Sequence, residues 1–199
     1  MLKNFMNTSH KIIGLAGTFS SGKDSLARFL EEKFSIKHIS TSDIVREFAQ
    51  EKYGSIERPV LYKTANELRE ERGAGILSQI AIERYESYKQ KYPGGVCISG
   101  FRAWAEAKVI KDKGGMIVFT DAPAKARYSR SIARARDNEK LNTFEEFLER
   151  EAKENGAVNS NFNLLGIKQK ADVVLDNDDA LDTFLMEAVV AIGLIKSKK

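Results

Sequence analysis

Residues Gly17 to Ser25, with the sequence GTFSSGKDS, have the types and spacing of a phosphate-binding loop, or P-loop. The segment follows the apolar run 12–16 and precedes a stretch with helical spacing of apolar residues, so it joins a predicted strand to a predicted helix. Its two glycines let backbone N–H groups curl around an anion, the helix start adds the positive end of its dipole, and Lys23 can reach the outer phosphates. An ordinary glycine-containing turn is the alternative. The residues predicted to bind ATP are Gly17, Thr18, Phe19, Ser20, Ser21, Gly22, Lys23, Asp24 and Ser25.

The residue after Lys23 departs from the usual P-loop pattern. A Ser or Thr hydroxyl usually stands there and helps to hold Mg²⁺. Here Asp24 occupies that position and Ser25 follows one residue later. The pattern therefore predicts the nucleotide cradle more firmly than the metal ligands.

Length and composition limit the possible classes of protein. The chain has 199 residues, 42% of them hydrophobic, which is enough for one domain with insertions. Its net charge is +4, but Lys196, Lys198 and Lys199 lie in a basic C-terminal tail, so the charge is a weak argument for nucleic acid binding. No feature of the sequence defines an oligomeric state.

The sequence also indicates a cellular compartment. The single cysteine, Cys97, cannot form an internal disulfide and is expected to be a small core residue. No apolar run approaches the ~20 residues of a membrane span, and residues 1–11 lack the apolar region of a secretory signal. We therefore expect a cytoplasmic protein with no membrane partner.

Hydrophobic periodicity predicts alternating strands and helices along the chain. Because parallel strands need crossover connections, strands separated by helices favour an α/β, mainly parallel, doubly wound sheet, which binds ligands at the carboxyl ends of its strands. The predicted strands are 11–16, 36–40, 95–99, 116–120 and 172–176, and the predicted helices are 22–33, 43–53, 59–72, 75–91, 103–112, 123–135, 143–154 and 179–193.

Two of these strand ends carry residues suited to a second anion. After strand 36–40, Arg46 follows Asp43 by three residues on the same side of a helix, so its guanidinium could return to the strand ends and bind a phosphate. The alternatives are that Ser42 or Asp43 simply caps that helix and that Arg46 is a surface arginine paired with a nearby glutamate. After strand 95–99, Gly100 permits close approach of a ligand and Arg102 supplies a bidentate donor.

These segments resemble nucleoside monophosphate kinases. Residues 40–46 look like the acceptor-binding stretch of adenylate kinases, and Gly100-Phe101-Arg102 looks like part of their glycine-phenylalanine-proline-arginine motif. The chain is especially similar, from about residue 12 to 188, to the archaeal adenylate-kinase-related family. It also resembles dephospho-coenzyme A kinases around residues 42–44 and 57–61. The acceptor-binding residues implied by the resemblance are Ser42, Asp43, Arg46, Gly100, Phe101 and Arg102.

The resemblance further implies an architecture and a set of metal ligands. It implies a three-layer P-loop NTPase fold with a mainly five-stranded parallel sheet, in a single domain spanning 1–199. The expected core is about 10–40, 94–135 and 170–195, with an acceptor-binding insert at about 41–93 and a lid at about 134–160. Members of the family often have an acidic residue where this chain has Ser99. The candidate Mg²⁺ ligands are therefore Asp24, Ser25, Ser99 and Asp121.

Arginines dominate the predicted helix 123–135. Arg127, Arg130 and Arg134 are spaced to share one face, and no acid lies between residues 125 and 136. Such a face favours an external polyanion, and in kinases of this type it resembles the start of the lid over the transferring phosphates. Nucleic acid is an unlikely alternative because no aromatic RNA-binding platform surrounds the arginines.

These features favour an ATP-dependent kinase of a small phosphorylated acceptor, most simply a nucleoside or deoxynucleoside monophosphate. The expected catalytic groups are Lys23, Asp43, Arg127, Arg130 and Arg134. In a dephospho-coenzyme A kinase, the acceptor would be a hydroxyl and Asp43 would act as the base. A nucleotide-dependent regulatory ATPase is the third interpretation, supported by the altered metal position at Asp24 and Ser99.

Overall fold

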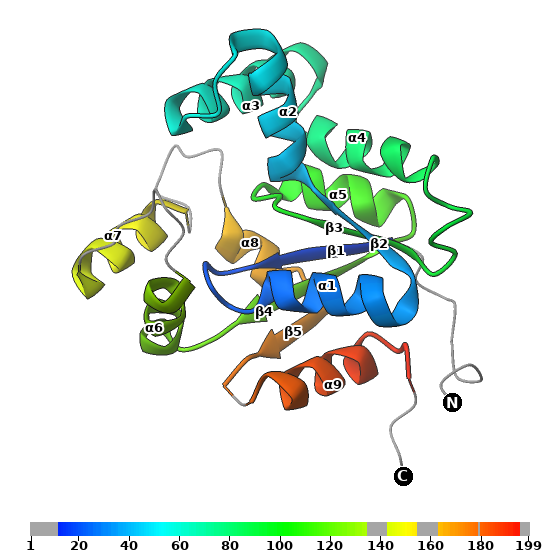
Figure 1. The fold of residues 1–199 in the computed structure, drawn as a ribbon, viewed down its shortest axis with the longest axis vertical. Coiled ribbons are helices and arrows are strands. Elements are labelled where there is room, and N and C mark those ends of the chain that lie inside the picture. Colours follow the sequence, from blue (N-terminus) through cyan, green and yellow to red (C-terminus); the bar gives the residue numbers. More distant parts are fainter. Residues whose placement is uncertain (1–11, 135–142, 155–162, 179, 196–199) are drawn as a thin grey trace.

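A parallel sheet of five strands forms the centre of the molecule (Figure 1). The computed structural model describes residues 12–134, 143–154, 163–178 and 180–195. All strand pairs are parallel, so the carboxyl ends of all strands meet at one edge. The strands are β1 (Ile12–Gly17), β2 (Ile36–Ser40), β3 (Gly95–Ser99), β4 (Met116–Asp121) and β5 (Val173–Asp176), in the order β2-β3-β1-β4-β5.

Helices cover both faces of this sheet (Figure 1). The first cluster of buried side chains joins β1, β3 and β4 to α1 and α9, and a second cluster joins the other face to α2, α4, α5 and α8. This arrangement confirms the predicted three-layer α/β fold. The helices in the described residues are α1 (Lys23–Phe34), α2 (Thr41–Tyr53), α3 (Arg58–Arg72), α4 (Ile76–Tyr85), α5 (Trp104–Asp112), α6 (Ala124–Arg134), α7 (Phe144–Glu154), α8 (Leu164–Gln169) and α9 (Leu181–Ala191).

Local sequence explains why α1 begins and packs where it does. Leu26, Leu30 and Phe34 recur every four residues, and all three are buried against the sheet. Burying a leucine or phenylalanine side chain contributes about 1.5–3 kcal/mol. The packed stripe therefore fixes α1 on β1 and β3, and it sets the position of the P-loop at the helix start.

Several element boundaries differ from the predictions. The helix predicted over 75–91 ends at Tyr85, and turns follow it. Helix α8 was not predicted, because it has only six residues and thus little periodicity. A capping box opens α7, since Glu146 N–H donates to Thr143 Oγ1 at 3.1 Å and Thr143 N–H donates to Glu146 Oε2 at 3.2 Å.

Some predictions fall outside the described residues. The first eleven residues, Arg136 and the C-terminal lysines lie there, as do 135–142 and 155–160 of the expected lid. Within the described residues, none of the helices combines the length and the apolar character needed to cross a membrane.

Candidate nucleotide and acceptor site

The P-loop lies where β1 ends beside β4 and close to β5. Gly17, the last residue of β1, pairs with Thr120 in the sheet register. Gly22 has a φ of 96°, and a Cβ there would lie 2.2 Å from Asn177 Nδ2. A side chain at Gly22 would therefore be strained and would also displace Asn177, so this position requires glycine.

Side chains from distant strands hold the loop in shape. Thr18 Oγ1 donates to Asp121 Oδ1 at 2.8 Å, and the hydroxyls of Ser21 and Thr120 share a 2.7 Å hydrogen bond. Asn177 Nδ2 donates to the Ser21 carbonyl oxygen at 2.9 Å. These contacts leave the loop pre-organised for an anion, because its backbone need not reorder on binding.

Within the loop, some polar groups are available to a ligand. Ser20 has a positive φ of 60°, and its buried Oγ has no hydrogen-bond partner among the described residues. Lys23 Nζ donates to Asp24 Oδ1 at 2.6 Å. Both side chains are partly exposed, so the ammonium group can exchange this contact for a phosphate. Ser25 follows on the first turn of α1 and is half-buried.

Asp121 supports the P-loop and is poorly suited to the predicted role of metal ligand. Its Oδ1 accepts from Thr18 Oγ1 and the Ala122 N–H, and its Oδ2 accepts from Lys168 Nζ at 2.5 Å. Although burial raises the pKa of the Asp121 carboxyl, the hydrogen bonds from Lys168, Thr18 and the Ala122 N–H outweigh burial and hold this pKa below its usual value. Both oxygens are thus already in use. Lys168 could not be found from the sequence pattern, because it lies on the short helix α8, 47 positions from Asp121.

Ser99 ends β3 on the other side of β1 from Asp121. Ser99 is buried, and its Oγ shares a 2.8 Å hydrogen bond with His38 Nε2. Burial, followed by the positive charge of Lys23, lowers the pKa of His38 below its usual value. Sequence spacing does not relate His38 to Ser99, because the two residues meet only when β2 pairs with β3.

The residues of this region could hold Mg²⁺ only together with phosphate oxygens of a bound nucleotide. In the part of the chain that the structure describes, no group of three or more His, Cys, Asp or Glu side chains could hold a metal ion. Mg²⁺ prefers oxygen ligands and usually combines one or two carboxylates with phosphates and waters. The Asp24 carboxylate and the hydroxyls of Ser25 and Ser99 are of this type.

Arg127 is not unpaired, contrary to the expected arginine face. Its Nη1 and Nη2 both donate to the Glu151 carboxylate on α7, the second at 2.9 Å, and its Nε donates to the Ala122 carbonyl oxygen at 2.6 Å. The side chain is only 6% exposed. Glu151 on α7 therefore supplies the acid that α6 lacks. Arg127 joins these two helices, so its guanidinium is already paired and does not form an open phosphate site.

Arg130 is connected to the P-loop by Asn177, which bonds both Arg130 and Ser21. Its Nη2 donates to the Asn177 carbonyl oxygen at 2.8 Å, while its buried Nη1 has no partner among the described residues. Arg130 thus retains donor capacity near the loop, and its role in binding phosphate stays a prediction. Arg134 is the last residue of α6, and its side chain lies outside the described part of the structure.

Helix α7 packs onto the P-loop by aromatic contacts. The rings of Phe19 and Phe147 lie 6.0 Å apart, and Phe147 is almost fully buried. The Arg150 guanidinium lies 4.8 Å above the Phe19 ring. Sequence spacing could not reveal these contacts, because the P-loop and α7 are far apart along the chain.

The acceptor-side residues meet at the carboxyl ends of β2 and β3. Gly100 has a φ of 87°, and a Cβ there would lie 2.9 Å from Ser42 Oγ, so β3 ends directly against α2. Helix α2 begins at Thr41 with Ser40 as its N-cap, so Ser42 and Asp43 do not cap it but lie in its first turn. The predicted apposition of the two segments is therefore present.

Arg46 and Phe101 differ from their expected roles. Arg46 Nη1 bonds Asp43 Oδ1 at 2.5 Å on an exposed surface, whereas the sequence suggested Glu47 or Glu51 as its alternative partners. Phe101 is 2% exposed within the hydrophobic core, so its side chain positions the loop and does not face a ligand. Arg102 is half-buried, and its backbone N–H donates to Glu106 Oε2 at 3.0 Å.

The fold has the architecture found in solved P-loop kinases. The shikimate kinase of Acinetobacter baumannii, solved in complex with shikimate, aligns with a TM-score of 0.59 at 15% identity and covers 93% of this chain and 94% of that chain. The shikimate kinase of Bacteroides thetaiotaomicron aligns with a TM-score of 0.53 at 14% identity, covering 92% and 98%. This likeness shows the fold.

Sequence comparison finds relatives of similar length. No known family model matches the chain. A UPF0200 protein of Thermococcus kodakarensis is 26% identical over 191 residues, which cover 94% of this chain and 99% of that protein. A UPF0200 protein of Thermococcus gammatolerans is 27% identical over 177 residues, covering 87% and 89%.

Proposed function

We propose that this protein is an ATP-dependent phosphotransferase that phosphorylates a small phosphorylated acceptor, a nucleoside or deoxynucleoside monophosphate. The observation that carries the proposal is the shared sheet edge. There the pre-organised P-loop after β1 lies next to the close contact between Gly100, after β3, and Ser42, after β2. One edge thus offers a donor cradle and an acceptor segment in neighbouring positions.

The chemistry would depend on positioning and charge. An oxygen of the acceptor phosphate would attack the γ-phosphorus of ATP, and the bond from that phosphorus to the ADP oxygen would break. No proton must be removed, because the acceptor phosphate is already anionic at neutral pH. Lys23 would leave Asp24 to bind the outer phosphates, and Arg102 would orient the acceptor.

The remaining predicted groups would support this transfer. Mg²⁺, when bound, would neutralise charge on the transferring phosphoryl group. Asp24, Ser25 and Ser99 would hold it directly or through waters. Arg130 would contribute a donor from α6, and Arg127 would act as a positioning residue through Glu151 on α7.

A hydroxyl acceptor, as in dephospho-coenzyme A, is the second candidate. The contact between Arg46 and Asp43 supports it, since an Arg46 guanidinium already bonded to a carboxylate is less available to an acceptor phosphate. In this case Asp43 would accept the proton of the attacking hydroxyl.

ATP consumption across a panel of acceptors tests the proposal. The panel contains the nucleoside and deoxynucleoside monophosphates and dephospho-coenzyme A, and we expect ADP and a diphosphate to form with one monophosphate class. Lys23→Ala should abolish turnover, whereas Lys33→Ala, an exposed lysine on the same helix, should not. ATP hydrolysis that is independent of every acceptor would favour the regulatory ATPase instead.

A further inference from the structure

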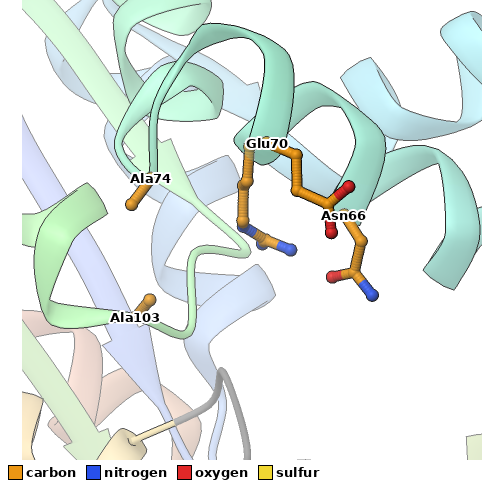
Figure 2. Close-up of a pocket in the computed structure, with 5 residues that line it drawn as sticks. Asn66, Glu70, Ala74 and Ala103 are labelled. Atoms are coloured by element: carbon orange, nitrogen blue, oxygen red, sulfur yellow. The ribbon is translucent and has the colours of Figure 1, made fainter.

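A pocket of about 260 Å³ lies between α3 and the start of α5, and its lining residues are Asn66, Arg69, Glu70, Ala74 and Ala103. Figure 2 shows Asn66 and Glu70 extending from α3, with Ala103 on the loop that leads into α5. Ala103 follows Arg102 directly, so the pocket opens beside the segment that we assign to the acceptor. None of the residues predicted from the sequence to bind a ligand lines it.

Arg69 is held at this pocket by a fully buried carboxylate. Its Nη2 donates to Glu106 Oε1 at 3.2 Å, and the Arg69 and Glu106 side chains are 13% and 0% exposed. Glu106 Oε2 accepts from the backbone N–H groups of Arg102 and Ala103, at 3.0 and 3.2 Å. Glu106 therefore fixes the Arg69 guanidinium relative to the backbone of Arg102.

The guanidinium of Arg69 retains unused donors. A guanidinium has five N–H donors, and the hydrogen bonds of Arg69 in the described residues use only Nη2. Its Nε is buried without a partner among those residues. A buried unpaired donor costs about 1–3 kcal/mol, so it calls for an explanation. A ligand oxygen in the pocket would supply one.

Arg69 suits an anion better than Arg46 does. Both arginines bond a carboxylate, but Arg46 is 46% exposed, whereas Arg69 is largely desolvated and held in a fixed orientation by Glu106. A desolvated guanidinium held in place binds carboxylate or phosphate more strongly, because water screens it less and less side-chain entropy is lost.

We propose that Arg69 binds an anionic group of the phosphoryl acceptor beside Arg102, and that the pocket holds hydroxyl or amino groups attached to it. This inference rests on the proposed kinase function. Glu70 is exposed and lines the pocket, where its carboxylate would repel a second anion but accept from a hydroxyl or amino group. The pocket therefore selects acceptors with one anionic group next to neutral donors.

Two acceptor classes share this chemistry. A nucleoside monophosphate has a phosphate and sugar hydroxyls, and a hydroxy acid such as shikimate has a carboxylate and ring hydroxyls. Shikimate is bound in one of the structures that share this fold. The anion at Arg69 is thus a phosphate in the first class and a carboxylate in the second.

Titration calorimetry on protein saturated with Mg²⁺ and the non-hydrolysable analogue AMP-PNP tests the inference. The probes are AMP, dTMP and shikimate. We expect Arg69→Gln to weaken binding of the preferred probe by about tenfold to hundredfold without changing the affinity for AMP-PNP. Arg72→Gln removes the same charge from an exposed position on the same helix and should bind as the wild type does.

The double variant Arg69→Gln/Glu106→Gln separates the loss of a ligand contact from damage to the protein structure. The single variant Arg69→Gln leaves the Glu106 carboxylate buried without its charged partner, and the double variant removes that carboxylate charge. Affinity that stays low in the double variant supports a contact between Arg69 and the acceptor. Recovery of wild-type affinity would show that Arg69 serves only Glu106 and would overturn the inference. So would failure of all three probes to bind the wild type, whereas failure of AMP-PNP would overturn the proposed function itself. A preference for AMP or dTMP assigns the phosphate, and a preference for shikimate assigns the carboxylate.

Discussion

Asp43 is the residue whose role differs most between the two candidate acceptors. It lies in the first turn of α2, is 65% exposed and bonds Arg46. For a hydroxyl acceptor this carboxylate would be the general base, whereas for a monophosphate no base is needed. A substitution that removes the charge but keeps the shape of the side chain therefore separates the two chemistries.

We predict that Asp43→Asn causes only a modest loss of turnover with a nucleoside monophosphate. If the acceptor is a hydroxyl, the same substitution should lower turnover by about 10² to 10⁴. Steady-state kinetics with AMP and with dephospho-coenzyme A measure both cases. Glu51→Gln on the same helix, also exposed, is the matched control. A large loss confined to dephospho-coenzyme A, together with loss of a carboxylate limb from the pH–rate profile, would contradict the monophosphate proposal.

At this scale the sequence predicted the residue types better than their contacts. The P-loop residues were predictable because a local pattern of glycine, lysine and serine defines them. His38, Lys168, Glu106 and Glu151 were not predicted as site residues, because their partners Ser99, Asp121, Arg69 and Arg127 lie at least 24 positions away in the chain. Spacing along one helix could show that Arg127 and Arg130 share one helix face, but not that α7 supplies a carboxylate to Arg127.

Helix α7 is the element that joins α6 to the candidate nucleotide site. Phe147 is 1% exposed and contacts Phe19 of the P-loop, while Glu151 bonds Arg127 on α6. These side chains lie on one face of α7, since residues four apart are neighbours on a helix. The docked position of α7 therefore depends on aromatic contacts centred on Phe147, on the Arg150 guanidinium over the Phe19 ring and on the ion pair between Arg127 and Glu151.

We predict that Phe147→Ala releases α7 from the P-loop and weakens ATP binding. Removing a buried phenylalanine typically costs about 3–5 kcal/mol, which is enough to open a single short helix locally. Hydrogen exchange should show loss of protection in the backbone amides of α7. Leu148→Ala alters the next residue, whose side chain is 39% exposed, and should leave that protection intact. Unchanged exchange in Phe147→Ala would contradict this role of Phe147 and assign the docking of α7 to its remaining contacts, the ion pair among them.

Helices and strands with a clear pattern of apolar residues were the ones whose bounds could be predicted from the sequence. Strand 36–40 and strand 95–99 have the predicted bounds, α1 differs from its prediction by one residue at each end, and α3 differs by one residue at its start. Helix α8 is too short for periodicity, and its start is set by Asn163, whose side chain accepts from the Gly166 N–H. Short helices of this kind depend on a single cap and on tertiary contacts, so sequence patterns rarely reveal them.

At the scale of the whole molecule, contacts between segments far apart in the sequence hold the candidate nucleotide site in shape. The P-loop is held by Asp121 and Asn177, which lie 103 and 156 positions from their partners Thr18 and Ser21. The alternation of strands and helices predicted a parallel sheet, but the strand order required the structure. The candidate nucleotide site is therefore a property of the assembled sheet, and ligand binding should report on global unfolding.

Cys97 offers a direct measurement of that coupling. It is the only cysteine in the chain, it is fully buried in β3, and burial raises the pKa of its thiol to about 12. The thiolate is the reactive form, so the native thiol should not react with Ellman's reagent at neutral pH. Reaction then requires opening of the sheet.

We predict that Mg²⁺ and ATP slow labelling of Cys97 by about 100-fold when ATP is present at 100 times its dissociation constant, because binding to the native state lowers the open fraction by that factor. Absorbance of the released thionitrobenzoate measures the rate. Lys23→Ala should retain slow basal labelling but lose the protection by ATP, since Lys23 contacts phosphates and supports no core packing. Rapid labelling of the native wild type would contradict the burial of Cys97. Equal protection by ATP in wild type and Lys23→Ala would contradict the assignment of the P-loop as the nucleotide site.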